Sequence, residues 1–79
     1  MLVIDNPEEG IDLLFRSFDV AQTVSIIEQQ NIAFYINIYV GLSLDEIDHE
    51  KYINKCLIII ENTNDTEIKR LFQEVIDML

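Results

Sequence analysis

The stretch Ile32–Val40, with the sequence IAFYINIYV, decides the fold that the sequence predicts. It is rich in β-branched and aromatic residues, which is typical of a strand. Alternate side chains of a strand point to opposite faces of a sheet. A period of two divides the stretch into one face with Ile32, Phe34, Ile36, Ile38 and Val40 and another face with Ala33, Tyr35, Asn37 and Tyr39.

The segments on either side of this stretch predict a helix before it and a second strand after it. The helix spans Val20–Gln30, with Asp19 as N-cap and Gln22 in the capping-box position. Gly41 ends the first strand. Lys55–Glu61 is apolar on both faces and predicts the second strand.

The C-terminal segment predicts an amphipathic helix. Its apolar residues recur at the spacing of one helical stripe. Asn64 is the expected N-cap, and Glu67 completes a capping box. The stripe consists of Ile68, Leu71, Phe72, Val75, Met78 and Leu79.

The stretch Leu13–Phe18 fits either a helix or a strand. Asn6-Pro7-Glu8-Glu9 is a good helix start, and apolar residues follow at helical spacing. Gly10 in the first turns and a new cap at Asp19 oppose a helix. We therefore prefer a short strand over Leu13–Phe18.

These elements give the order β-α-β-β-α in a single domain of 79 residues. The predicted fold class is α+β, ferredoxin-like, with an antiparallel sheet and both helices on one face. Residues 1–12 form an N-terminal segment in this prediction, and residues 43–54 form an acidic insert between the last two strands.

The chain resembles a family of small bacterial domains described as prokaryotic signal-transducing proteins. The resemblance lies in Leu14–Ala21, in Ile26–Ile32 and in the final strand and helix, Cys56–Leu79. Asn31 stands where the family usually has glycine. The resemblance implies a ferredoxin-like fold, distantly similar to PII-type signalling proteins, and a regulatory or interaction role. It implies no functional residue.

The charge of the chain is negative and uneven. The net charge is −10, and residues 1–50 contain ten acidic residues and one basic residue, Arg16. This field repels phosphate, so we expect no binding to nucleic acid or to an anionic membrane. It favours a basic protein partner, although it could equally serve solubility alone.

The residue inventory indicates a cytoplasmic protein without cofactors. No signal peptide is visible after Met1, and the single cysteine, Cys56, lies in an apolar run and excludes an internal disulfide. We expect Cys56 to be a buried apolar side chain. The chain also lacks a glycine-rich phosphate loop.

We expect no catalysis and no metal site. Asp45, Asp48 and His49 would share one face of a short helix that begins with a Ser43–Glu46 capping box, and that spacing can present metal ligands. A solvated acidic helix face explains the same residues more simply. His49 has no nucleophile placed beside it.

The predicted sheet leaves one face uncovered, and this face is the expected protein interface. It would present Tyr35, Asn37 and Tyr39 with Leu57 and Ile59, or with Cys56, Ile58 and Ile60 if the second strand has the other register. The first strand would add Arg16 or Phe15. The insert or the N-terminal segment could instead fold over it.

Two functions follow as hypotheses. The first is a non-enzymatic regulatory or interaction domain that forms a homodimer or docks a partner through the open sheet face. The alternative is an acidic inhibitor or immunity-type protein that binds a basic protein, with Asp45, Glu46, Asp48 and Glu50 as its acidic patch.

Overall fold

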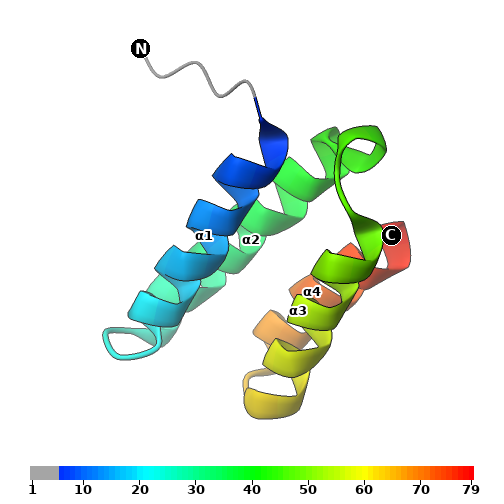
Figure 1. The fold of residues 1–79 in the computed structure, drawn as a ribbon. Coiled ribbons are helices and arrows are strands. Elements are labelled where there is room, and N and C mark those ends of the chain that lie inside the picture. Colours follow the sequence, from blue (N-terminus) through cyan, green and yellow to red (C-terminus); the bar gives the residue numbers. More distant parts are fainter. Residues whose placement is uncertain (1–5) are drawn as a thin grey trace.

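The computed structural model describes residues 6–79, and this part of the chain is helical and contains no strand (Figure 1). The elements, in order, are α1 (Pro7–Ala21), α2 (Ile26–Leu42), the short 3-10 helix η1 (Leu44–Glu46), α3 (His49–Asn62) and α4 (Thr66–Met78). The predicted ferredoxin-like α+β fold is therefore wrong.

Each of the four long helices begins at a side chain that caps it. The cap oxygen accepts a backbone N–H of the first turn, which would otherwise have no partner. Pro7 follows the first cap at a position where its missing N–H costs nothing. The four caps are Asn6, Ser25, Asp48 and Asp65.

The first predicted strand, Leu13–Phe18, lies inside α1. α1 begins at Asn6-Pro7-Glu8-Glu9, the helix start that the sequence indicates as the alternative to a strand. Asp19, the expected cap, is inside the same helix. The predicted helix Val20–Gln30 is also wrong, because a turn at residues 22–25 separates α1 from α2.

The two later strands are wrong as well. Ile32–Val40 lies within α2, and Lys55–Glu61 lies within α3. Because α2 has apolar side chains around its whole circumference, its sequence fits a period of two as well as a helical period. The insert at residues 43–54 forms η1 and the first part of α3. Residues 1–5 of the N-terminal segment lie outside the described residues.

The C-terminal helix is confirmed. Ile68, Leu71, Phe72 and Val75 are buried along one stripe of α4. The cap is Asp65 instead of Asn64, and its Oδ1 accepts the N–H of Ile68 at 2.9 Å.

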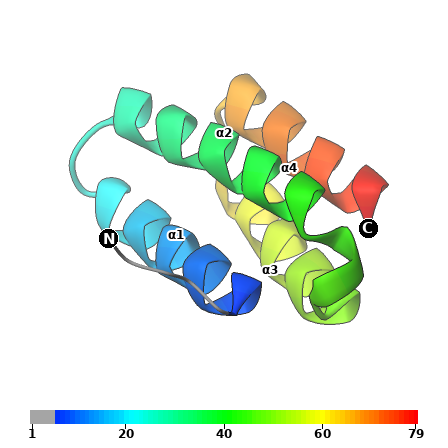
Figure 2. The same cartoon turned by 90° about the horizontal axis from the view of Figure 1, so that it is seen from above.

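The helices form two antiparallel pairs, α1 with α2 and α3 with α4. The two pairs join where α2 packs against α4. Figure 2 shows α2 running between α1 and α4. Consequently α2 has a neighbour on each flank.

An aromatic cluster fills the core between the two pairs. Phe15 of α1 stacks on Tyr52 of α3, with ring centroids 5.8 Å apart. Phe72 of α4 lies 6.0 Å from Phe15 and meets Phe18 edge-on at 5.2 Å. Offset and edge-on pairs of this kind are the preferred aromatic geometries. The cluster therefore links α1 to both helices of the second pair.

The fold removes the basis for a role in signal transduction. That role followed from a resemblance that implies a ferredoxin-like sheet, and residues 6–79 form no sheet. The open sheet face that was the predicted interface is likewise absent from this part of the chain.

Replacing Gly41 by alanine should stabilise the protein. Gly41 lies in the last turn of α2 without a positive φ, and an added Cβ would meet the Met78 sulfur at an ordinary 3.4 Å. Alanine in a helix is favoured over glycine by about 0.5–1 kcal/mol. Urea unfolding should show an increase of up to this size. A decrease would contradict the described end of α2.

Candidate protein-docking surface

One side of α2 is buried and the opposite side is exposed, and both sides are apolar. Ala33, Ile36 and Val40 have no exposed surface and face the core. The other side contains five large apolar residues, each between 39 and 76% exposed. We call these residues the α2 outer face: Ile27, Phe34, Tyr35, Ile38 and Leu42.

The α2 outer face is large for a domain of this size. A large side chain that is half exposed presents on the order of 100 Å², so the five residues together present roughly 500 Å². The largest contiguous apolar patch on a typical monomer is about 300–600 Å² and is often functional. Asn31 is the exposed polar residue within the stripe. The α2 outer face is therefore a candidate protein-binding surface.

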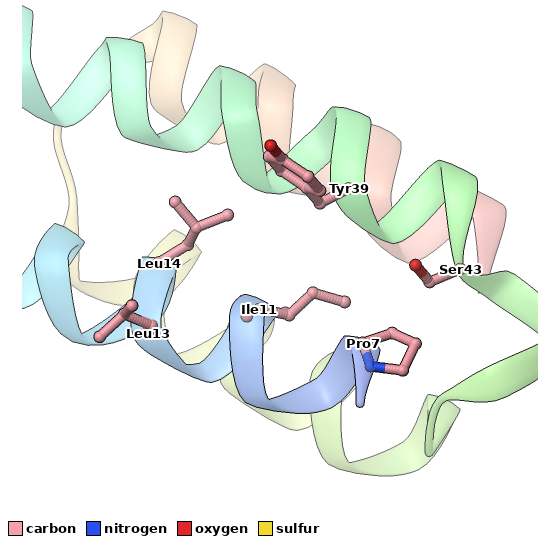
Figure 3. A pocket seen from close by; sticks show the side chains of 7 residues that line it. Pro7, Ile11, Leu13, Leu14, Tyr39 and Ser43 are labelled. Carbon is pink, nitrogen blue, oxygen red and sulfur yellow. The ribbon is translucent and has the colours of Figure 1, made fainter. Parts of the chain in front are cut away.

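A groove between α1 and α2 adjoins this surface. Figure 3 shows side chains from the two helices lining opposite sides of it. Tyr39 of α2 lies over the groove, and Leu13 is exposed at its α1 edge. The groove has a volume of about 350 Å³ and is lined by Pro7, Gly10, Ile11, Leu13, Leu14, Tyr39 and Ser43.

Acidic residues mark both ends of the α2 outer face. Glu28 is the single charged residue of Ile26–Leu42 and lies in the first turn. Beyond the last turn, Leu42 and the acidic pair Asp45 and Glu46 line one shallow depression. The apolar surface therefore continues directly into negative charge.

The four residues of the predicted acidic patch are all exposed. Asp45 and Glu46 lie in η1, Asp48 caps α3, and Glu50 lies in the first turn of α3. The carboxylate of Asp48 accepts the N–H of Lys51 at 3.2 Å. Asp48 therefore also stabilises the start of α3.

The predicted interface residues on α2 take different roles. Tyr35 and Tyr39 are each about half exposed, with Tyr35 on the outer face and Tyr39 at the groove. Asn37 faces α4, where its amide donates to the Leu71 carbonyl at 3.2 Å and to Glu74 at 3.1 Å. Asn37 therefore holds α2 and α4 together.

The predicted interface residues on α3 are separated from those on α2. Leu57 is exposed beside Ile58, whereas Ile59 is 8% exposed and belongs to the core. Leu57 and Ile58 thus form a small apolar pair on another helix. The other register of the predicted strand would also place Cys56 and Ile60 at the interface. In the structure Cys56 is buried and Ile60 is partly buried.

The helix face on which Asp45, Asp48 and His49 were expected to lie together does not form. Asp45 lies in η1, and His49 begins α3, so Asp45, Asp48 and His49 are not on one helix. The His49 ring nitrogen Nε2 lies 2.5 Å from the Leu44 carbonyl oxygen. Across residues 6–79, no three Asp, Glu, His or Cys side chains are grouped as metal ligands.

A polar cluster joins the first two turns of α1 to the first turn of α3. The Tyr52 hydroxyl donates to Asp12 Oδ1 at 2.8 Å, and Lys51 Nζ donates to Asp12 Oδ2 at 3.0 Å. Glu8 accepts the Asp48 N–H at 2.6 Å. Tyr52 itself is fully buried against Phe15. These hydrogen bonds link the start of α1 to the start of α3.

The cluster shifts the pKa values of its members. Burial alone would raise the pKa of Asp12, but the hydrogen bonds from Lys51 and Tyr52 outweigh it, so the pKa lies below the ordinary value. Burial and the neighbouring Asp12 carboxylate raise the pKa of the Tyr52 hydroxyl, which keeps it a proton donor.

Cys56 is buried among the core residues. Burial raises the pKa of its thiol to about 12, so the reactive thiolate is absent at neutral pH. This placement agrees with the expectation of a buried apolar side chain.

The sequence interpretation missed four residues of the α2 outer face, which are Ile27, Phe34, Ile38 and Leu42. Phe34 and Ile38 were assigned to the helix-covered side of a strand. A signal for the correct helix is present, because Ser25 and Glu28 have the spacing of a capping box. The Ser25 hydroxyl does accept the N–H of Ile27 at 3.1 Å.

The fold and its surface define a small acidic helical domain with an exposed apolar helix face. No family model, curated protein or solved structure matches the chain. None of the helices in residues 6–79 combines the length and apolar character needed to cross a membrane.

The Asp12 cluster should make stability depend on pH. Because the folded pKa of Asp12 is depressed, its contribution is present above the unfolded pKa of about 3.9 and is lost as the pH falls through the folded value. Asp12→Asn should lower the free energy of unfolding by about 1 kcal/mol at pH 7. This difference from wild type should shrink towards pH 2.

Urea unfolding at a series of pH values measures this difference. Asp19→Asn is the matched control, since it removes one charge from an exposed position of α1. The same pH dependence in both variants would contradict a specific role for the Asp12 cluster.

Proposed function

We propose that this domain binds a protein partner through the α2 outer face and that it has no catalytic activity of its own. The observation that supports the proposal most strongly is the composition of α2. The helix contains one charged residue and is apolar on the buried side and on the exposed side. A helix of this kind is normally buried on all sides. Binding of a partner would bury the remaining side.

The groove beside α2 supports the same function. It is concave and mostly apolar, and Tyr39 contributes a broad ring with a hydroxyl at its edge. Tyrosines are enriched at the energetic centres of interfaces because they combine apolar area with a hydrogen-bonding group. A large side chain of the partner could occupy this groove while its backbone lies along α2.

Inhibition of a basic protein is a second candidate function. The observation that favours it is the exposed group Asp45, Glu46, Asp48 and Glu50, together with the net charge of −10. Negative charge of this density accelerates association with a basic partner. Both candidate functions require binding of a partner protein. They differ because an inhibitor lowers the activity of its bound partner, whereas a docking domain does not.

The double variant Phe34→Ser with Ile38→Ser should strongly weaken partner binding and leave the fold intact. Both side chains are largely exposed, so each substitution should lower the free energy of unfolding by only about 1 kcal/mol or less. Loss of two central contacts should weaken binding by roughly 100-fold, since such residues each contribute 1–2 kcal/mol or more at interfaces.

The measurement is quantitative affinity capture from lysate of the source cells with wild type and the variant, followed by the affinity of the purified pair. Leu57→Ser with Ile58→Ser is the matched control, because it removes an exposed apolar pair from α3. The proposal requires a partner that wild type and the control capture and the α2 variant does not. Capture of the same proteins by all three would contradict it.

A further inference from the structure

The charges around the α2 outer face restrict the chemistry of what can cover it. No lysine or arginine occurs in Ile26–Leu42, and acidic residues lie at both ends of the face. On the α4 flank, Glu74 reaches Asn37, and Arg70 is held in ion pairs with Glu67 and Glu74. The border of the apolar surface is therefore mainly negative.

A second copy of this chain is a poor occupant of such a surface. A twofold dimer applies the same face to itself. If the two α2 helices were antiparallel, Glu28 of one copy would approach Asp45 and Glu46 of the other. If they were parallel, each acidic residue would approach its own equivalent. Either arrangement places like charges together across the interface, which disfavours binding.

The geometry of α2 favours a helix as the occupant. Phe34, Ile38 and Leu42 follow one another every four residues and form a continuous ridge along the helix. A second helix packs against such a ridge with side chains interdigitated. An extended strand would need a sheet edge with free N–H and C=O groups, and residues 6–79 contain no sheet.

We infer that the partner segment is an amphipathic helix with an apolar stripe that covers the α2 outer face and with lysine or arginine residues at its ends. This inference rests on the proposed function and specifies its partner. α2 has 17 residues, so the partner helix is roughly 25 Å long, or between four and five turns.

The cations of the partner concentrate at the end that lies over η1. Asp45 and Glu46 follow the α2 outer face directly, and Asp48 and Glu50 lie just beyond them, whereas Glu28 is the acidic residue of the first turn at the other end. The C-terminal end of α2 also has the negative pole of the helix dipole, which favours cations. Asp45 and Glu46 are therefore the residues to change in a test.

Synthetic peptides are the probes for this inference. The first is a fluorescent peptide of about 17 residues, matched to α2 in length, with leucine at helical spacing, lysine at both ends and glutamine at the remaining positions. The second has glutamate in place of lysine, and the third has the composition of the first in scrambled order. Fluorescence anisotropy measures the binding of each peptide to wild type, to Asp45→Asn with Glu46→Gln, and to Phe34→Ser with Ile38→Ser.

The expected result is selective, salt-dependent binding of the ordered lysine peptide. It should bind wild type at least about tenfold more tightly than the glutamate and scrambled peptides do. Asp45→Asn with Glu46→Gln should weaken its binding about threefold to tenfold and reduce the salt dependence. Phe34→Ser with Ile38→Ser should abolish its binding.

The outcomes that overturn the inference differ from those that overturn the proposed function. Equal binding of the lysine and glutamate peptides, lost in the Phe34 and Ile38 variant, would refute the basic partner and retain α2 as the docking surface. If the lysine peptide binds Phe34→Ser with Ile38→Ser as tightly as it binds wild type, the α2 outer face is not the docking surface. If no peptide binds, the inference is overturned. It is also overturned if analytical ultracentrifugation shows that wild type forms a dimer and that Phe34→Ser with Ile38→Ser does not.

Discussion

The packing of α2 against α1 on one flank and α4 on the other is the contact on which the structure depends. The two antiparallel helix pairs each close through a short turn, and α2 and α4 bring the pairs together. Side-chain amides strengthen this contact, because Asn37 and Gln30 of α2 donate to groups on α4 and at its cap. The aromatic core lies between the two pairs.

Within residues 6–79, the same contact leaves one side of α2 without a neighbour. A helix in a small domain has an apolar side for the core and a polar side for water. The outward side of α2 instead has the composition of a core, and the nearby carboxylates of Glu28, Asp45 and Glu46 keep the domain charged around it. This combination is the basis of the proposed partner, which is complementary to the apolar surface and to its acidic border.

The sequence predicts the parts of this fold in which the helical period is unambiguous. In α4 the stripe of Ile68, Leu71, Phe72 and Val75 alternates with polar residues, and only a helix buries it. In Ile32–Val40, which lies within α2, every residue except Asn37 is apolar or aromatic, so this stretch fits a strand equally well. Local periodicity cannot decide such a case, and the Ser25 cap is the local signal that does. The docking surface was missed for the same reason, since assigning a strand moves Phe34 and Ile38 to the buried side.

The two-sided character of α2 is tested most directly by comparing Phe34→Ala, Ile36→Ala and Ile38→Ala in urea unfolding. In a strand these three side chains share one face, whereas in α2 only Ile36 is buried. The structure predicts that Ile36→Ala lowers the free energy of unfolding by about 2–5 kcal/mol, and that Phe34→Ala and Ile38→Ala each lower it by less than about 1 kcal/mol. Similar large losses at all three positions would contradict the helix and, with it, the exposed α2 outer face.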